Sequence, residues 1–121
     1  DVELGEHRVA ARVGFDIDIA NEFEMADGKT TGKLVPPIVD PDGEFGKLGR
    51  LHYLARERSI DLSATAAIGD GSNDIPMLLA AGMGCGYRGK PKVRAVAGCQ
   101  LNFADLTGLL FYMGYRRGEF A

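Results

Sequence analysis

Residues 67–78 read AIGDGSNDIPML, and this stretch decides the fold. The apolar run over residues 65–68 predicts a buried strand, and the glycines on either side of Asp70 allow a sharp turn. Helical spacing of apolar residues predicts a helix over Ile75–Ala81. Asp70 therefore stands at the carboxyl end of a strand, the edge where open α/β sheets bind ligands. Because carboxylates are the hard oxygen ligands that Mg²⁺ selects, the pattern is typical of a magnesium-dependent phosphoryl-transfer site.

Helical and extended patterns alternate on both sides of this stretch. The predicted elements are a helix over Val2–Val13 capped by Gly14, a strand at Ile17 and Ile19, extended runs Asn21–Met25 and Thr30–Val35 around Asp27-Gly28, a helix over Phe45–Arg58, strands near Gly84–Tyr87 and Gly98–Leu101, and helices over Lys92–Ala97 and Ala104–Met113. An Asp-Gly pair between extended runs is a strong hairpin signal. Strands that alternate with helices predict an α/β fold with a parallel, doubly wound sheet.

Composition argues against several classes of partner. The net charge is −3 and the pI is near 5.3, with the basic residues spread out, which argues against nucleic acid or an anionic membrane. No apolar stretch reaches the roughly 20 residues that span a bilayer. Cys85 and Cys99 lack the spacing of a disulfide scaffold or a metal site, so buried, inert thiols are expected. These features predict a cytoplasmic location.

Three segments resemble one known family. The run GDGSNDIPMLLAAG followed by GCGYRGKPKV is similar to the fourth motif and downstream segment of haloacid dehalogenase (HAD) superfamily phosphatases, and within them to the phosphoserine phosphatases. Upstream, HRVAARVGFDIDIANEFEMADGKTTGKLV resembles the helix, strand and hairpin after the second motif, and ADLTGLLFYMGY resembles the last helix. The resemblance implies a HAD-like Rossmannoid, three-layer parallel sheet, of which this chain supplies the second half plus a small β-hairpin flap over about residues 20–35.

The family's nucleophile motif has no counterpart in the chain. Members carry an aspartate in a DxDx(T/V) motif and a later Ser-Gly-Gly, and neither occurs here. We therefore expect residues 1–121 to be the carboxyl-terminal part of one HAD-like catalytic core domain, with the nucleophile and cap upstream, and the segment alone to be inactive. Asp16 and Asp18 imitate the motif, but they follow a helical pattern and lack the hydroxyl residue. We expect them instead on alternating positions of a strand, facing solvent.

Four side chains are the candidate site residues. The resemblance implies that Asp70 ligates Mg²⁺, and the alternative is an aspartate serving its own glycine turn. It implies that Asp74 orients metal-bound water or a lysine. The alternative is a carboxylate that only caps the following helix, where the helix dipole stabilises a negative charge. Asn73 would lie near the phosphoryl group or substrate, or act as a helix N-cap. Lys47, which lies 23 positions before Asp70, matches the family's third-motif lysine and would neutralise phosphate; the alternative is a solvated lysine.

A basic loop follows the predicted strand near Gly84–Tyr87. Arg88, Lys90 and Lys92 lie at the same sheet edge as Asp70, where they could contact substrate, hold the loop in place or remain solvated. The sequence leaves these three alternatives open.

Taken with the resemblance, these residues imply Mg²⁺-dependent hydrolysis of a small phosphomonoester. The substrate implied is O-phospho-L-serine, cleaved to L-serine and phosphate through an aspartyl-phosphate intermediate. Two alternatives stay open: another HAD phosphatase or phosphotransferase, and a non-catalytic HAD-like module. The expected partner is the small-molecule substrate, without nucleic acid or membrane, and a homodimer is compatible with the sequence.

Overall fold

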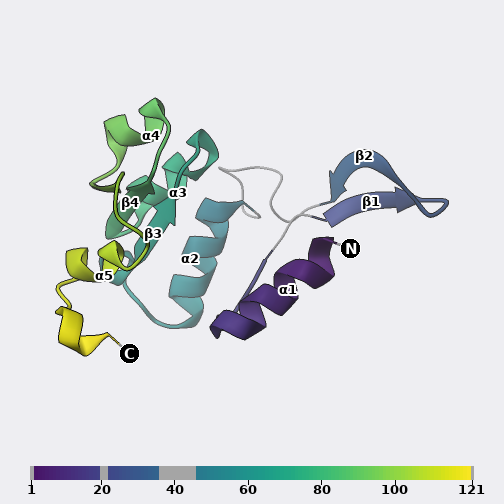
Figure 1. The fold of residues 1–121 in the computed structure, drawn as a ribbon. Helices are drawn as coiled ribbons and strands as arrows, with labels where there is room; N and C mark the ends of the chain where they lie inside the picture. The colour runs from purple at the N-terminus through teal and green to yellow at the C-terminus, as the bar shows by residue number, and fades with distance from the viewer. Residues whose placement is uncertain (1, 20–21, 36–45, 121) are drawn as a thin grey trace.

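The computed structural model describes residues 2–19, 22–35 and 46–120, and it contains a β-hairpin and a separate three-stranded sheet with helices (Figure 1). The first helix, α1, covers Val2–Val13, and α2 covers Lys47–Glu57. Short 3₁₀ turns lie at Leu62–Ala64, Ser72–Asp74 and Arg117–Glu119. No helix among the described residues is long and apolar enough to cross a membrane.

The hairpin forms where the Asp-Gly pair predicts it. Strand β1, Glu22–Ala26, pairs antiparallel with β2, Lys29–Val35. Asp27 has φ 52° and Gly28 has φ 75°, so both central residues occupy the left-handed region that a type I′ turn requires. The prediction of a hairpin is therefore confirmed, although Asn21, the predicted first residue, lies outside the described part.

The parallel sheet is built from three short strands in sequence order. Strand β3 covers Ala66–Gly69, β4 covers Met83–Tyr87 and β5 covers Cys99–Leu101. The order is β3-β4-β5, and both pairs run parallel. The connections contain α3, Ile75–Ala80, and α4, Pro91–Val96. The alternation of strands and helices read from the sequence is thus confirmed.

Glycines in β4 show which helices cover which face of the sheet. A Cβ on Gly84 would meet the Leu78 carbonyl of α3 at 2.0 Å, and one on Gly86 would meet Val93 of α4 at 3.1 Å. These helices therefore pack on one face of the sheet. The final helix, α5, Gly108–Tyr112, meets the other face, because a Cβ on Gly108 would lie 2.7 Å from Leu101 of β5. The sheet is consequently the middle of three layers.

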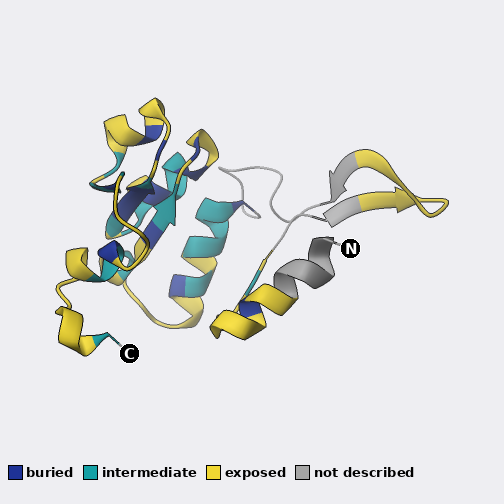
Figure 2. Cartoon of the chain, in the orientation of Figure 1, coloured by how far each residue is buried: buried dark blue, intermediate teal, exposed yellow. Residues whose placement is uncertain are grey.

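The core lies between the sheet and the helices α3 and α4. Ala67, Leu78 and Val93 form its buried cluster, and Val93 has no exposed surface. Figure 2 shows the buried residues concentrated at this sheet and the adjoining loops, with largely exposed surface at the carboxyl-terminal end. The carboxyl edge of the sheet, where the strands end, therefore lies beside closely packed side chains.

Two predicted elements differ in the structure. The segment over residues 15–19 is not a strand: it pairs with no described strand, and a ladder needs a neighbour's hydrogen-bonding groups. Asp16 there is exposed, whereas Asp18 is half-buried and does not simply face solvent. The last helix begins at Gly108 instead of Ala104 because Asp105 accepts hydrogen bonds from the Thr107 backbone N–H and hydroxyl, which builds a turn.

Candidate active site

The loop after β3 is organised by one buried carboxylate. Asp74 is 2% exposed and ends the 3₁₀ turn before α3. Its Oδ2 accepts hydrogen bonds from the backbone N–H of Asp70 at 3.0 Å and of Gly71 at 3.1 Å. The side chain therefore reaches back across the turn to the end of β3, and it makes no side-chain cap of α3. A role confined to capping the following helix does not describe Asp74.

The other oxygen of this carboxylate binds a distant lysine. Lys47 is the first residue of α2, and its Nζ donates a hydrogen bond to Asp74 Oδ1 as part of an ion pair. The Lys47 side chain is 39% exposed, whereas that of Asp74 is 3% exposed. An ammonium carries three donors, so Lys47 keeps donors beyond this contact for a bound anion. The two residues, 27 apart in sequence, thus share one position beside the β3 loop.

The pKa of Asp74 reflects this environment. Burial alone would raise it, but the hydrogen bond from Lys47, the Gly71 N–H, the Lys47 charge and the Asp70 N–H together hold the pKa below its ordinary value. The carboxylate is therefore ionised at neutral pH, which keeps the ion pair with Lys47 intact.

Two further contacts fix the loop, and neither could be predicted from the local sequence pattern. A Cβ on Gly69 would lie 2.5 Å from Asp74 side-chain atoms, so only glycine leaves room for the carboxylate. The Lys90 backbone N–H, after β4, donates to the Asp70 carbonyl at 3.1 Å. This backbone contact ties the loop after β4 to the Asp70 loop, and it leaves the role of the exposed Arg88, Lys90 and Lys92 side chains a prediction. The guanidinium carbon of Arg88 lies 5.4 Å from the Tyr87 ring centroid.

The remaining candidates lie at the rim of this arrangement. Asp70 is exposed and stands directly after β3, at the carboxyl edge of the sheet. Asn73 is also exposed, but it lies within the 3₁₀ turn and is not an N-cap, a position that Gly71 and Asp74 take for the turn and for α3. Its Oδ1 comes within 2.7 Å of the place where a Gly71 Cβ would be, so its side chain lies over that glycine.

The donor set suits a cation that keeps much of its water. Within the described residues, no group of three His, Cys, Asp or Glu side chains could hold a metal ion. Mg²⁺ is commonly bound by one or two carboxylates with waters and substrate phosphate as the other ligands. Asp70, exposed beside a buried anion that is already neutralised by Lys47, fits such a site as one of its ligands.

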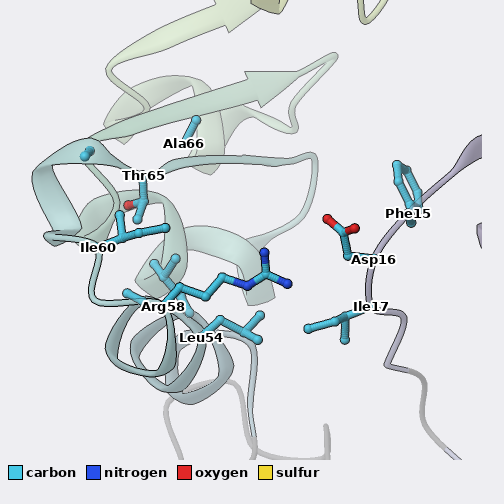
Figure 3. A pocket seen from close by; sticks show the side chains of 11 residues that line it. Phe15, Asp16, Ile17, Leu54, Arg58, Ile60, Thr65 and Ala66 are labelled. Atoms are coloured by element: carbon cyan, nitrogen blue, oxygen red, sulfur yellow. The ribbon is translucent and has the colours of Figure 1, made fainter.

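A separate groove lies away from these residues, between α2, the start of β3 and the segment over residues 15–17 (Figure 3). It has a volume of about 390 Å³ and a mostly apolar lining that includes Phe15, Ile17 and Leu54. Asp16 and Arg58 point toward one another across it. None of the four candidate site residues lines this groove, so it is no part of the candidate site.

Comparison with known proteins assigns the family. The model of the haloacid dehalogenase-like hydrolases matches residues 6–79, which include the β3 loop and the Lys47–Asp74 pair. The chain belongs to the haloacid dehalogenase-like hydrolases. This assignment confirms the resemblance and the HAD-like fold that it implied.

Relatives within this HAD-like family are phosphoserine phosphatases. The chain is 40% identical over 111 residues to phosphoserine phosphatase SerB2 of Mycobacterium tuberculosis, covering 92% of this chain and 26% of that protein. It is 38% identical over 109 residues to the phosphoserine phosphatase of Saccharomyces cerevisiae, covering 89% and 34%. A solved structure described as the phospho-aspartyl intermediate analogue of phosphoserine phosphatase matches with TM-score 0.78 and 30% identity, over 91% of this chain and 51% of that one.

Each match covers most of this chain but only a part of the relative. The HAD-like chain is matched almost throughout, yet it spans only 26% and 34% of the two curated relatives. The likeness therefore establishes the family and the fold of this region.

Proposed function

We propose that the protein carrying this chain is a Mg²⁺-dependent phosphomonoester hydrolase whose substrate is O-phospho-L-serine. The products would be L-serine and phosphate, which is the last step of serine biosynthesis, carried out in the cytoplasm. Support for the substrate comes from the phosphoserine phosphatases that share 38% and 40% identity with the chain. The partner proposed is this small molecule, without nucleic acid or membrane.

One observation carries the proposal: the buried Asp74 carboxylate and the partly exposed Lys47 ammonium meet beside the β3 loop, at the carboxyl edge of the sheet. Asp74 bonds the loop's backbone and the Lys47 ammonium at once, and Asp70 is left exposed beside them. A purely structural ion pair would not need an exposed carboxylate on the same short loop. The arrangement offers one group for a cation and one for a phosphate.

Each residue has a proposed part in binding. Asp70 would hold Mg²⁺, which when bound neutralises phosphate oxygens. Lys47 would direct its remaining donors at the transferring phosphoryl group, whose oxygens carry spread negative charge. Asp74 would fix the position of that ammonium, and Asn73 would lie close enough to contact substrate. Because the ion pair between Lys47 and Asp74 is formed before substrate arrives, the Lys47 ammonium needs little reorientation when substrate binds.

The proposed chemistry transfers phosphate twice. An aspartate carboxylate outside this chain attacks phosphorus, the P–O bond to serine breaks, and the serine oxygen takes up a proton to leave as the hydroxyl. Water then hydrolyses the aspartyl phosphate to phosphate and the free carboxylate. The structural neighbour solved as a phospho-aspartyl intermediate analogue supports this route. Asp16 is not proposed as the nucleophile, because its segment is no strand and it lies at the separate groove.

The test is phosphate release from O-phospho-L-serine, O-phospho-L-threonine and a sugar phosphate, each with and without Mg²⁺. It compares the 121-residue chain with the same chain in its full reading frame. Selective, Mg²⁺-dependent turnover of phosphoserine by the longer protein alone is the expected result. Preference for another ester would assign a different phosphatase of the family, and no turnover of any ester would favour a non-catalytic module. Turnover by the short chain would restore Asp16 as a nucleophile.

A further inference from the structure

The two cysteines, 14 positions apart in sequence, are neighbours in the sheet. Cys85 of β4 and Cys99 of β5 are direct partners in the parallel ladder. Partners in adjacent strands project their side chains to the same face, and the strands lie about 4.8 Å apart. Disulfide-linked residues have Cα atoms roughly 4.4 to 6.8 Å apart, so the strand spacing falls within the required range. The spacing of the two strands therefore meets the Cα distance condition for a disulfide.

The face they share is the one that α5 covers. Leu101, two residues after Cys99 and hence on the same face, packs near Gly108 of α5. The core cluster of Ala67, Leu78 and Val93 lies on the opposite face. Joining the two sulfurs would thus leave that core and its helices undisturbed.

The two thiols differ in access to solvent. Cys85 has no exposed surface, whereas Cys99 is half-buried. Burial, and after it a hydrogen bond between the two cysteines and the charge of Cys99, raise the pKa of Cys85 to about 12. Cys99 lies with its Sγ 3.7 Å from the Gly84 carbonyl oxygen. An oxidant from solvent would therefore react first with Cys99, and Cys85 lies on the neighbouring strand as the second thiol.

We propose that Cys85 and Cys99 form a modification site, a reversible intramolecular disulfide between neighbouring strands, with a peroxide as the oxidant. The Cys99 thiolate attacks a peroxide oxygen, which breaks the O–O bond and gives a sulfenic acid and hydroxide or an alkoxide. The Cys85 sulfur then attacks the Cys99 sulfur, its proton leaves with the displaced hydroxyl as water, and the S–S bond closes. Two thiols are oxidised and one peroxide is reduced. The site is independent of the proposed hydrolase activity.

The test treats the folded chain with hydrogen peroxide and measures intact mass and tryptic peptides. Trypsin cleaves after Arg88 and after Arg94, so the cysteines fall on different peptides. The expected product has lost two hydrogen atoms, contains the two peptides joined, and returns to the original mass with dithiothreitol. Far-UV circular dichroism is followed throughout, so that only native samples are scored.

Matched variants separate the two thiols. Cys99→Ala should abolish the cross-link and leave Cys85 unoxidised, because its sulfur is buried. Cys85→Ala should stop at a Cys99 sulfenic acid that dimedone traps, and in the unsubstituted chain maleimide should label Cys99 at least ~10-fold faster than Cys85, as accessibility controls thiol reactivity. Accumulation of Cys99 sulfinic acid in the native chain, with Cys85 still a free thiol, would overturn the proposal. So would cross-links found only between two molecules.

Discussion

Replacing Asp74 by asparagine tests whether the ion pair with Lys47 stabilises the chain. The amide keeps the carboxylate's shape, and its oxygen can still accept from the Asp70 and Gly71 N–H groups. Only the bond to the ammonium is lost, and the amide NH₂ then faces another donor. A hydrogen bond to a charged group contributes roughly 1.5 to 3 kcal/mol. Because the Lys47 side chain is 39% exposed, water replaces part of this, and a loss of about 1 to 2 kcal/mol is expected.

The assay is a double-mutant cycle in urea at pH 7 with Asp74→Asn, Lys47→Met and the double variant. Lys47→Met should cost at least as much as Asp74→Asn, because it leaves a buried carboxylate without its cation. The coupling free energy isolates the pair and should be about 1 to 2 kcal/mol. A coupling under about 0.5 kcal/mol, the range over which independent sites add, would refute the reasoning.

The same variants carry a pH test. The pKa of Asp74 is held below its ordinary value, so its contribution to stability is fully present above about 3.9, the unfolded value. That contribution is lost as pH falls through the lower folded pKa. Urea midpoints of the unsubstituted chain should therefore approach those of Asp74→Asn in strong acid, while the two stay separated at neutral pH. A gap of the same size at both pH values would contradict the assigned pKa direction.

The remaining predictions concern the loop and its cation. Gly69→Ala should cost about 1 to 3 kcal/mol in urea, since its Cβ would lie 2.5 Å from a buried carboxylate, whereas Gly98→Ala, with its nearest atom 3.8 Å away, should change stability by less than about 0.5 kcal/mol. Lys90→Pro removes the backbone N–H that donates to the Asp70 carbonyl, while the φ of −62° at this position is one that proline accepts. The proline variant should therefore be about 0.5 to 1.5 kcal/mol less stable than Lys90→Ala, and equal stabilities would exclude a contribution from this hydrogen bond. Asp70→Asn in the full protein should weaken Mg²⁺ activation at least ~10-fold, as for loss of a charged ligand, and Asp16→Asn should not; an unchanged Mg²⁺ requirement would remove Asp70 from the metal site.

Local sequence patterns predicted the elements whose turn residues and apolar spacing lie within the element itself. The hairpin followed from Asp27-Gly28, whose left-handed conformations the turn needs. The strand and helix around Asp70 followed from apolar spacing and flanking glycines. Over residues 15–19 the alternation of isoleucines suggested a strand, but a strand exists only with a partner. The late start of α5 came from the competing turn at Asp105.

The candidate site was less accessible to such reasoning. Asp70 and Asp74 could be singled out as neighbours on one turn, and Lys47 came from family spacing alone. That the ammonium meets Asp74 depends on how α2 lies against the β3 loop, which no local pattern encodes. The need for glycine at Gly69 and the Lys90 N–H contact likewise arise only when separate segments pack together.

The two sets of bonds at Asp74 also differ in when they can form during folding. Bonds to the Asp70 and Gly71 amides close loops of only three or four residues, so they can appear within a few-residue turn. The bond to Lys47 closes a loop of 27 residues and must wait until α2 docks, because its chain entropy has to be offset by other contacts. Undocking of α2 would consequently release the cation while the acidic turn kept its shape. The charge balance of this loop therefore depends on whether α2 is docked against it.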